Sequence, residues 1–412
     1  MKILLLSYRG NPYCGGQGIY IYYLARELVR QGHQVKMMVG PPYPESMDGI
    51  PVYPITNFNF FGRKTGFLPP GNPFQIFSPL HFYEFVVTRF NSFPEMTAFS
   101  LRAFKKVVEL LRHERFDIIH DNQCLGYGLL LLRALKIPVI ATIHHPLHID
   151  CGIEFEHRPH LRDKVRMALY YPLLMQRIVA KRLDKIITVS NKSAHDIERY
   201  FRVPRKNIRV VYNGIDLEAF RPLANIKKIP HSLIFVGNTD DRKKGILYLL
   251  QAMQLLEDHI KLIIVDGGAT RKEYASRLVR KYGLKDRVIF RGNINQNKLI
   301  DLYAAAQIAV VPSLYEGFGF PAGEAMACGL PVIATWAGAL PEVVGEQGEG
   351  GILVPARDPA ALAFHIKGLL HDERRMEKMG ELARKRIAEN FTWEKAGRDI
   401  IQAYQETRRA YR

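Results

Sequence analysis

Two glutamates could act together on one ligand. Residues 313–334 read SLYEGFGFPAGEAMACGLPVIA, so Glu316 and Glu324 lie on either side of a Gly-Phe-Gly-Phe-Pro run. This run argues against one unbroken helix and predicts Glu316 on a loop after a strand, with Glu324 in the first turns of the next helix. Two-oxygen carboxylates suit the vicinal hydroxyls of a ribose or hexose, whereas they would repel a phosphate. The competing interpretation is a helix-capping acid plus an exposed loop glutamate.

A group of cations follows another strand. Arg242, Lys243 and Lys244 come after the FVG of residues 235–237 and directly precede Gly245. Negative charge grows on a leaving nucleoside diphosphate as its bond to a sugar breaks, so fixed cations stabilise that transition state. The end of a strand is also where open α/β sheets bind ligands. The alternative is a solvated basic turn.

Two glycine-rich stretches connect a strand to a helix, and both predict loops that hold phosphate through backbone N–H groups. The first contains Gly15, Gly16 and Gly18, and the second contains Gly317 and Gly319. The first does not follow the G-x-G-x-x-G pattern, and no acidic residue follows a second strand at the right distance. Nicotinamide dinucleotide binding is therefore poorly supported.

The elements that would position these residues form a repeated pattern of short apolar runs followed by amphipathic stretches. Such alternation predicts buried parallel strands with crossover helices. The runs cover residues 2–7, 34–40, 116–120, 138–144, 185–190 and 208–214, and then 232–237, 260–268, 287–292, 308–313, 331–335 and 351–355. We expect two doubly wound α/β units, joined by a linker at 216–231, and a final helix over roughly 394–412.

Bulk composition agrees with a large globular chain. A length of 412 residues predicts two domains, and 47% apolar with 24% charged residues is ordinary for folded proteins. The net charge of +18 favours anionic ligands. Four dispersed cysteines argue against a disulfide framework and for a reducing cytosol. The first residues are too short for a signal-peptide core, and we expect no transmembrane helix.

Two segments depart from this pattern. Residues 53–93 are rich in phenylalanine, glycine and proline. This composition predicts either an insertion packed over the first domain or a lid that faces a lipid-linked or otherwise apolar acceptor. Residues 161–183 mix apolar residues with arginine and lysine. They indicate either an ordinary helix on the first sheet or a patch that docks on an acidic membrane surface.

Several of these motifs resemble glycosyltransferase family 4, whose members are retaining, nucleotide-sugar-dependent enzymes. The resemblance rests on residues 313–335, on VVYNGID at 210–216, and on FVG with the later Lys-Gly at 244–245. It implies the GT-B fold: two Rossmann-like domains facing each other across a cleft, with a C-terminal helix that crosses back to the first. The implied domains are 1–215 with 394–412, which binds the acceptor, and 216–393, which binds the donor.

The resemblance also implies residue roles. Glu316 matches the family's contact to the donor sugar, Glu324 its contact to the nucleotide ribose, and Lys244 the lysine that neutralises the diphosphate. His144 matches the histidine near the reacting carbon. The loop positions that face the donor are Gly15, Gly16, Gly317, Phe318 and Gly319.

Two positions depart from the family pattern. Asn238 stands where the family usually has an arginine, and an amide cannot supply that charge. Either Arg242 or Lys243 compensates, or the donor phosphates are held more weakly. Asp266 stands where the family often has a glycine, and we expect this difference to affect which nucleobase is selected.

The predicted function is transfer of a hexose from a nucleoside diphosphate sugar to a hydroxyl of a glycan or lipid-linked acceptor. This places the enzyme in polysaccharide biosynthesis, in the cytoplasm or on the inner face of the membrane, without metal or cofactor. The alternatives are a GT-B sugar phosphorylase, a nucleotide-sugar epimerase, and a nucleic-acid-binding protein, although no recognised nucleic-acid motif is present. A metal site at His144, His145, His148 and Asp150 is a further interpretation.

Overall fold

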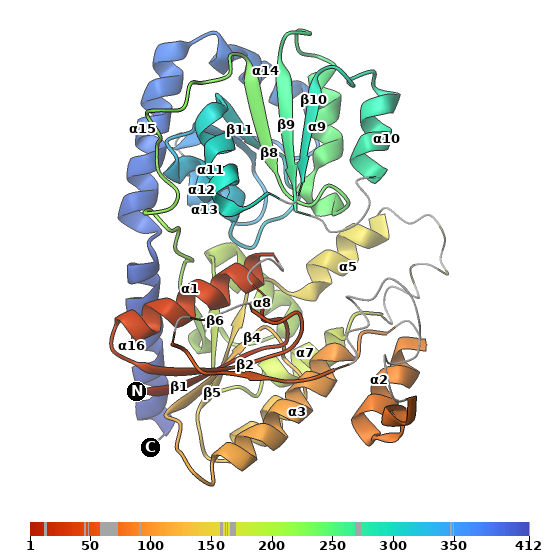
Figure 1. The fold of residues 1–412 in the computed structure, drawn as a ribbon, viewed down its shortest axis with the longest axis vertical. Coiled ribbons are helices and arrows are strands. Elements are labelled where there is room, and N and C mark those ends of the chain that lie inside the picture. The colour runs from red at the N-terminus through yellow and green to blue at the C-terminus, as the bar shows by residue number, and fades with distance from the viewer. Residues whose placement is uncertain are drawn as a thin grey trace. The chain divides into compact units, whose positions relative to one another are not determined.

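The computed structural model describes residues 1–11, 15–44, 47, 49–57, 73–89, 92–156, 160, 162, 164, 170–267, 273–292, 294–346, 348 and 350–411. The chain divides into two compact units, one formed by residues 1–211 with 396–412 and the other by residues 212–395. Each unit is an α/β structure built on one parallel sheet (Figure 1).

The first sheet has the strand order β3-β2-β1-β4-β5-β6-β7, and every pair in it is parallel. Its strands are β1 (Lys2–Ser7), β2 (Gln34–Val39), β3 (Val52–Pro54), β4 (Ile118–Asn122), β5 (Val139–Ile143), β6 (Lys185–Thr188) and β7 (Ile208–Val210). Six of the seven confirm strands expected from apolar runs. The sequence missed β3 because this edge strand has three residues, one of them a proline.

The second sheet has the order β10-β9-β8-β11-β12-β13 and is also parallel throughout. Its strands are β8 (Ser232–Val236), β9 (Lys261–Asp266), β10 (Val288–Gly292), β11 (Ile308–Val311), β12 (Val332–Thr335) and β13 (Gly351–Val354). All six were expected from the sequence. The prediction of two doubly wound α/β units is thus confirmed.

The helices lie between consecutive strands along the chain, except for the last three, which follow β13. In the first unit they are α1 (Gly16–Arg30), η1 (Pro73–Phe77), α2 (Pro79–Arg89), α3 (Glu95–Leu110), α4 (Gly128–Arg133), α5 (Leu147–Glu156), α7 (Leu173–Ala180), α8 (Asn191–Phe201) and η2 (Arg205–Asn207). In the second they are η3 (Arg242–Lys244), α9 (Ile246–Met253), α10 (Glu273–Lys281), α11 (Gln296–Ala305), α12 (Phe320–Ala327), α13 (Leu340–Val344), α14 (Pro359–Leu370) and α15 (Glu373–Asn390). The last helix is α16 (Trp393–Tyr411).

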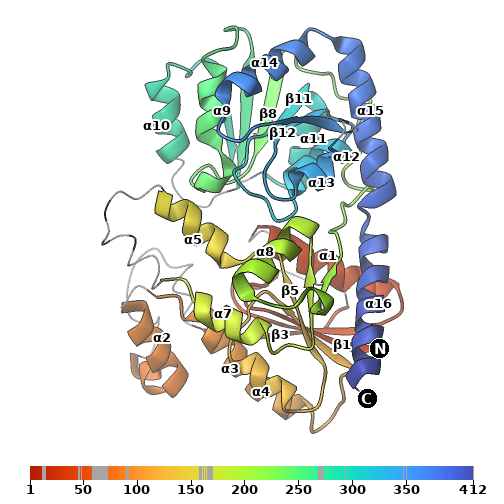
Figure 2. The ribbon, with the colours of Figure 1, turned by 180° about the vertical axis from the view of Figure 1, so that it is seen from behind.

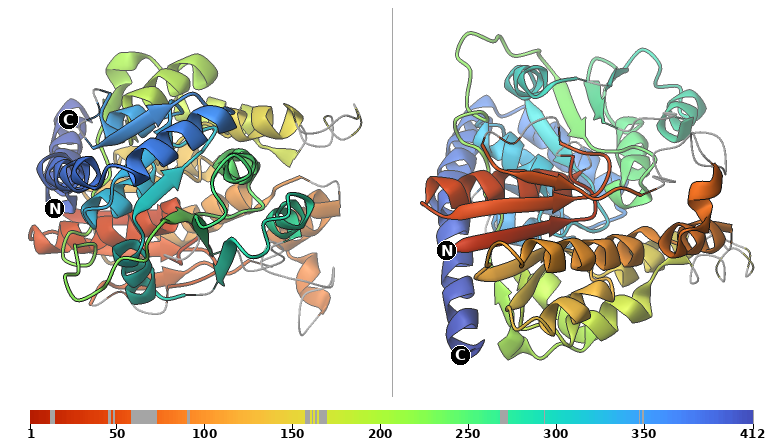
Figure 3. Two further views of the ribbon diagram at one scale, coloured as in Figure 1. Left: turned by 90° about the horizontal axis from the view of Figure 1, so that it is seen from above. Right: turned by 60° about the horizontal axis from the view of Figure 1, so that its bottom comes forward.

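The core of the first unit lies on both faces of its sheet. Leu4 and Leu6 of β1 pack with residues of α3, α4, α7 and α8 on one face. Ile3 and Leu5 alternate with them, are fully buried, and therefore face the opposite side. That side is covered by α1 and α16, as two views of the ribbon show (Figure 2, Figure 3). Because helices cover both faces of the sheet, side chains on both sides of each strand are buried, and the strand sequences are continuous apolar runs.

The second unit is built in the same way. Leu233 and Phe235 of β8 belong to a cluster formed with α9, α10 and α14 on one face of the sheet. The helices α12 and α13 contact β11 and β12, and α12 contributes the fully buried Ala322 and Ala325.

The helix α16 completes the first unit although it is remote in sequence. Tyr404, which is fully buried, hydrogen-bonds His120 of β4 across 2.6 Å. Arg408 forms an ion pair with Asp117, also at 2.6 Å. The expected C-terminal helix that returns to the first domain is therefore confirmed.

The aromatic segment is only partly described, because Phe58, Phe60, Phe61, Phe67 and Phe90 lie outside the described residues. Of the others, Phe93 packs against the core, whereas Phe74, Phe77 and Phe82 expose half or more of their surface.

Part of the basic segment 161–183 also lies outside the described residues, but its end forms α7, whose Met175 and Val179 are in the core. This part matches the ordinary helix interpretation. Cys124, Cys151 and Cys328 are buried free thiols, and Cys14 is not described. Among the described helices, none is long and apolar enough to cross a membrane.

Candidate functional site

Both sheets have a point at which the strand order reverses, between β1 and β4 in the first and between β8 and β11 in the second. Open α/β sheets bind their ligands beyond the carboxyl ends of the strands at such a point. The glycine loop of residues 15–16 follows β1, and the cations of η3 follow β8. Glu316 lies in the loop after β11. The sequence-predicted residues therefore gather where the topology favours a ligand.

The cation turn η3 is fixed by local contacts. The Asp241 carboxylate caps it by accepting a hydrogen bond from the Lys243 backbone N–H at 3.0 Å. Gly245 ends it in the left-handed region at φ 67°, where a Cβ would lie 1.9 Å from the carbonyl oxygen of Pro312. Leu314 N–H also donates to the Lys243 carbonyl oxygen at 2.6 Å. These contacts hold the turn after β8 against the loop after β11, so only glycine fits at position 245.

The structure brings Lys244 and Glu316 into direct contact. Lys244 Nζ lies 2.8 Å from Glu316 Oε1, and Ser313 Oγ donates to the same oxygen at 2.8 Å. Glu316 is 8% exposed. Burial by itself raises the pKa of Glu316, but the Lys244 ammonium and the two hydrogen bonds outweigh it and hold the pKa below its usual value. The carboxylate is therefore charged at neutral pH.

The backbone of Glu316 is held as firmly as its side chain. Its carbonyl oxygen accepts from Ala339 N–H at 2.9 Å. Gly338, at φ 59°, packs so closely that a Cβ there would lie 2.1 Å from that oxygen. The loop before α13 thus fixes the position of Glu316.

Glu324 lies in the second turn of α12, as the sequence predicts, and is buried. Tyr303 of α11 donates its hydroxyl to Glu324 Oε2 at 3.2 Å. Burial raises the pKa of Glu324 to about 7, although the Tyr303 hydrogen bond opposes the shift. The two glutamates thus differ in charge near neutral pH, because Glu316 has a cation beside it and Glu324 has a phenol.

The segment between the two glutamates forms the start of α12. Gly319 is its N-cap at φ 100°, and Pro321 lies in its first turn. The ring of Phe318 is buried against Phe320 and Phe391, with centroids 5.3 and 5.8 Å away. The side chain of Phe318 therefore packs inward.

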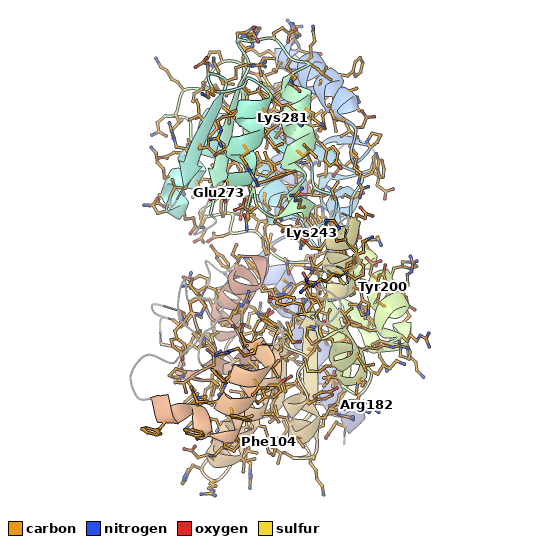
Figure 4. The ribbon with its side chains drawn as sticks, turned by 90° about the vertical axis from the view of Figure 1, so that its right-hand side faces the viewer. Phe104, Arg182, Tyr200, Lys243, Glu273 and Lys281 are labelled. Atoms are coloured by element: carbon orange, nitrogen blue, oxygen red, sulfur yellow. The ribbon has the colours of Figure 1, made fainter. Side chains whose placement is uncertain are left out.

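The other cations of η3 have different partners. The Arg242 guanidinium lies 4.1 Å from the ring centroid of Tyr274 and donates to its hydroxyl at 3.3 Å. Lys243 Nζ lies 3.8 Å from Asp241 Oδ2. Lys243 and Glu273, the residue before Tyr274, are labelled in the side-chain view (Figure 4). Lys244 is in direct contact with Glu316, and the charge of Lys243 also helps to lower the pKa of that carboxyl.

The two residues that depart from the family pattern, Asn238 and Asp266, form hydrogen bonds within the second unit. Asn238 Oδ1 accepts from the Asp240 backbone N–H at 3.0 Å, so its amide closes the turn after β8. Asp266, at the end of β9, is buried and accepts a hydrogen bond from the Thr239 hydroxyl. Both side chains stabilise the loop that leads to η3.

In the first unit, His144 follows β5 and is 7% exposed. Its Nε2 lies 2.8 Å from Asn122 Oδ1, and its ring meets that of Tyr20 edge-on with centroids 4.8 Å apart. Burial lowers the pKa of His144 to about 3, so the ring is neutral at physiological pH. Gly15 is the N-cap of α1 at φ 88°, directly before Gly16.

The histidines proposed as metal ligands have separate partners. His145 Nε2 lies 2.9 Å from Asp150 Oδ2, while His148 stacks on Tyr200 with centroids 5.1 Å apart. His144 bonds Asn122 instead. Within the described ranges, no three His, Cys, Asp or Glu side chains gather as a metal site would require.

Sequence reasoning missed the residues that hold the predicted ones, namely Ser313, Tyr303 and Gly338 in the second unit and Asn122 and Gln123 in the first. The polar run DNQ at 121–123, at the carboxyl end of a buried strand, was a signal for the last two. No such signal marks Ser313, Tyr303 and Gly338, because their contacts depend on tertiary packing.

Family models match both halves of the chain. The model for glycosyltransferase family 4 matches residues 14–219, and the model for glycosyl transferases group 1 matches residues 218–386. The chain is 35% identical to MMP alpha-(1->4)-mannosyltransferase of Mycolicibacterium hassiacum, with 98% of each chain covered. The chain belongs to glycosyltransferase family 4. This glycosyltransferase is also 27% identical to D-inositol 3-phosphate glycosyltransferase of Xylanimonas cellulosilytica, over 98% of the chain and 95% of the relative.

Solved structures agree with a GT-B glycosyltransferase. Sucrose-phosphate synthase from Thermosynechococcus elongatus superposes with a TM-score of 0.76 at 25% identity, with all of both chains covered. The Anabaena protein HepE, solved with UDP and glucose, gives a TM-score of 0.71 at 21% identity over 98% of this chain and 99% of HepE. The glycosyltransferase thus has the GT-B fold expected from the sequence.

Proposed function

We propose that this glycosyltransferase moves a hexose from a nucleoside diphosphate sugar to an acceptor hydroxyl and retains the configuration of the anomeric carbon. The observation that carries the proposal is the contact between Lys244 Nζ and Glu316 Oε1 at the switch point of the second sheet. We assign the cation of this pair to the diphosphate and the ionised carboxylate to the sugar hydroxyls. The name of the 35% identical relative favours mannose as the sugar.

In the proposed reaction, Lys244 holds the diphosphate and Glu316 accepts hydrogen bonds from the sugar hydroxyls. The bond between the anomeric carbon and the phosphate oxygen breaks, and its electron pair stays on the departing diphosphate. The acceptor oxygen bonds the same face of that carbon, and its proton passes to a phosphate oxygen. Lys244 stabilises the transition state because the charge beside it grows as the bond breaks. Backbone amides of residues 317–319 assist.

We assign donor binding to residues 216–393 and acceptor binding to residues 1–215 with 394–412. Glu324 accepts a hydrogen bond from the nucleotide ribose, and neutral His144 lies near the reacting carbon. The glycine loop at Gly15 and Gly16 contributes backbone N–H groups. Because Lys244 supplies positive charge, the proposed reaction needs no metal, and activity should persist in EDTA.

We propose a glycan or lipid-linked acceptor and action at the cytoplasmic face of a membrane. The support is the exposed trio Phe74, Phe77 and Phe82 together with the net charge of +18. Cosedimentation with vesicles of anionic and of neutral lipid tests this part. Pelleting with neither kind of vesicle would refute membrane docking and leave the transfer reaction untouched.

A thermal-shift screen against UDP-, GDP-, ADP- and dTDP-sugars tests the donor, because a ligand that binds the folded state raises Tm. The donor that raises Tm is then used, labelled in its sugar, with candidate acceptors. Retention predicts that the product keeps the anomeric configuration of the donor. An isomerised nucleotide sugar without acceptor would indicate an epimerase, and a sugar phosphate formed from a glycan and phosphate would indicate a phosphorylase.

A further inference from the structure

The orientation of the Asn122 amide is fixed by its neighbours. Asn122 Nδ2 donates to the backbone carbonyl oxygen of Gln17 at 3.0 Å and to Ser7 Oγ at 3.2 Å. A carbonyl oxygen can only accept, so the amide nitrogen must be the atom that faces Gln17. Ser7 Oγ gives its own proton to the carbonyl oxygen of Arg9 at 2.7 Å and therefore accepts from Asn122. The other amide atom, Oδ1, is left to face His144.

This orientation determines which nitrogen of His144 carries the proton. Asn122 Oδ1 lies 2.8 Å from His144 Nε2 and has no proton to give. Nε2 must therefore be the donor. In a neutral imidazole the other nitrogen, Nδ1, then carries a lone pair. Within the described part of the chain, no hydrogen bond to Nδ1 is found.

We infer that Asn122 is a positioning residue that holds His144 as the Nε2–H tautomer and so presents Nδ1 as an acceptor for a substrate hydroxyl. The inference rests on the proposed role of His144 near the reacting carbon. An acceptor nitrogen selects a hydroxyl, which has a proton to donate, over a phosphate oxygen, which has none at neutral pH. His144 would thus bind a sugar or acceptor hydroxyl and leave the diphosphate to Lys244.

The backbone around His144 is held by Gln123, the residue after Asn122. Gln123 Oε1 accepts from the His144 backbone N–H at 2.6 Å, and Gln123 Nε2 donates to the His145 carbonyl oxygen at 2.9 Å. Ser193 Oγ donates to the His144 carbonyl oxygen at 2.9 Å. Gln123 itself adopts φ 54°, a left-handed conformation that is rare for a residue with a side chain. Strain of this kind persists where surrounding contacts enforce it, often at functional sites.

Asn122 also joins His144 to the glycine loop. Gln17 belongs to the first turn of α1, directly after Gly16. A single amide therefore joins the end of β1, the start of α1, the end of β4 and the residue after β5. Its loss would release the ring of His144 and the start of α1 together.

The titratable groups around His144 come from three elements: Tyr20 in α1, His120 in β4 and the adjacent His145 after β5. The pKa of His120 is lowered to about 3 and that of Tyr20 is raised, in each case mainly by burial. His120 and Tyr20 therefore stay neutral between pH 5 and 8. These two side chains therefore do not change the charge around His144 over this range.

The first experiment observes the tautomer directly in the full chain labelled with ¹⁵N-histidine, with the His144 signal assigned by its loss in His144→Gln. We expect a protonated Nε2 and an unprotonated Nδ1 at pH 7. In Asn122→Leu the amide acceptor is gone, and we expect signal from the Nδ1–H form to appear. A wild-type spectrum with Nδ1 protonated, or an unchanged tautomer in Asn122→Leu, would overturn the inference.

The second experiment uses Asn122→Asp, which keeps an acceptor beside Nε2 and adds a negative charge. A carboxylate there favours the imidazolium and raises the pKa of His144, so the acidic limb of the kcat/KM profile should move up by about one to three pH units. A merely structural defect would lower kcat/KM equally at every pH. Asn225→Asp, at an exposed position, is the matched control and should leave the profile unchanged.

A turnover assay of His144→Ala, set beside the tautomer measurement, separates this inference from the proposed function. Wild-type turnover in His144→Ala would refute a role for His144 in the reaction, yet the tautomer would still be readable from the labelled protein. Conversely, a large loss of turnover in His144→Ala together with an Nδ1–H ring would leave the proposed function standing and remove the role of Asn122.

Discussion

Lys244 Nζ and Glu316 Oε1 lie 2.8 Å apart, although 72 residues separate them in the chain. The contact joins the loops after β8 and β11, which are neighbouring strands of the second sheet. Glu316 is buried and Lys244 partly exposed, so the ion pair has one side open to a ligand. A bound diphosphate would share the ammonium, and Glu316 would keep the Ser313 hydroxyl as a hydrogen-bond donor.

Removing either charge should abolish most of the turnover. We expect Lys244→Ala and Glu316→Ala each to lower kcat by at least about 100-fold, because each group is proposed to contact the reacting donor. The double variant should lose less than the product of the two losses, since the residues act as a unit. Steady-state kinetics measure the losses, and circular dichroism checks the fold.

A matched control lies on α11, where Lys298 and Asp301 form an exposed pair at 3.7 Å. Lys298→Ala removes the same charge from the same unit and should leave kcat unchanged. Near-wild-type turnover in Lys244→Ala would contradict the assigned role. A similar loss in Lys298→Ala would point to a general charge effect.

Gly338→Ala should lower activity by displacing Glu316. The added Cβ would lie 2.1 Å from the Glu316 carbonyl oxygen, so this backbone must shift. Gly283 has a similar conformation, with φ 70°, but nothing lies within 4 Å of a Cβ there. Both variants should lose about 1 kcal/mol of stability from the left-handed conformation. If Gly283→Ala reduces donor binding as much as Gly338→Ala, the contact with Glu316 is not the cause.

Glu324→Gln should stabilise the ligand-free protein at high pH but not at low pH. The pKa of Glu324 is about 7 in the folded state against 4.5 in the unfolded chain, mainly because of burial. The folded state therefore keeps its proton longer, so stability is fully present below about pH 4.5 and is lost as pH rises through 7. Glutamine does not titrate, and it can still accept the Tyr303 hydrogen bond.

The size of this effect follows from the pKa difference and is roughly 3 kcal/mol at pH 8. Urea unfolding of the two proteins at pH 4 and pH 8 measures it. All other titratable groups are the same in the two proteins, so their contributions cancel in the difference between the two free energies of unfolding. An equal stability difference at both pH values would show that Glu324 titrates normally.

Tyr404→Phe should destabilise the first unit by about 1–3 kcal/mol. It removes the hydroxyl 2.6 Å from His120 Nδ1 and leaves that buried nitrogen without its partner on α16. Tyr411→Phe is the control on the same helix, because the Tyr411 hydroxyl bonds the Arg133 carbonyl oxygen at the longer distance of 3.3 Å near the surface. The lowered denaturation midpoint should be confined to Tyr404→Phe.

Most of the architecture could be predicted because parallel strands covered on both faces leave dense apolar runs in the sequence. The three-residue strand β3 has no such run and was missed. The loop position of Glu316 and the helical position of Glu324 were also predictable, since Gly319 and Pro321 mark the start of α12.

The partners of these residues were not predictable. The family resemblance singles out Lys244 as the cation for the diphosphate, but its contact with Glu316 could not be predicted, because that contact depends on how the left-handed Gly245 turns the chain after η3. In the same way, Asn122 meets His144 only because β4 and β5 are adjacent in the sheet. Hydrogen bonds between neighbouring strand ends follow from topology rather than from spacing.

The position of α16 has a consequence for biosynthesis. His120 receives its contact from Tyr404, which lies 284 residues later in the chain. During translation one face of the amino-terminal sheet therefore stays incompletely covered until α16 has left the ribosome. Chaperone demand should be greatest in that interval, and nascent chains arrested before residue 396 should be more sensitive to protease than released ones.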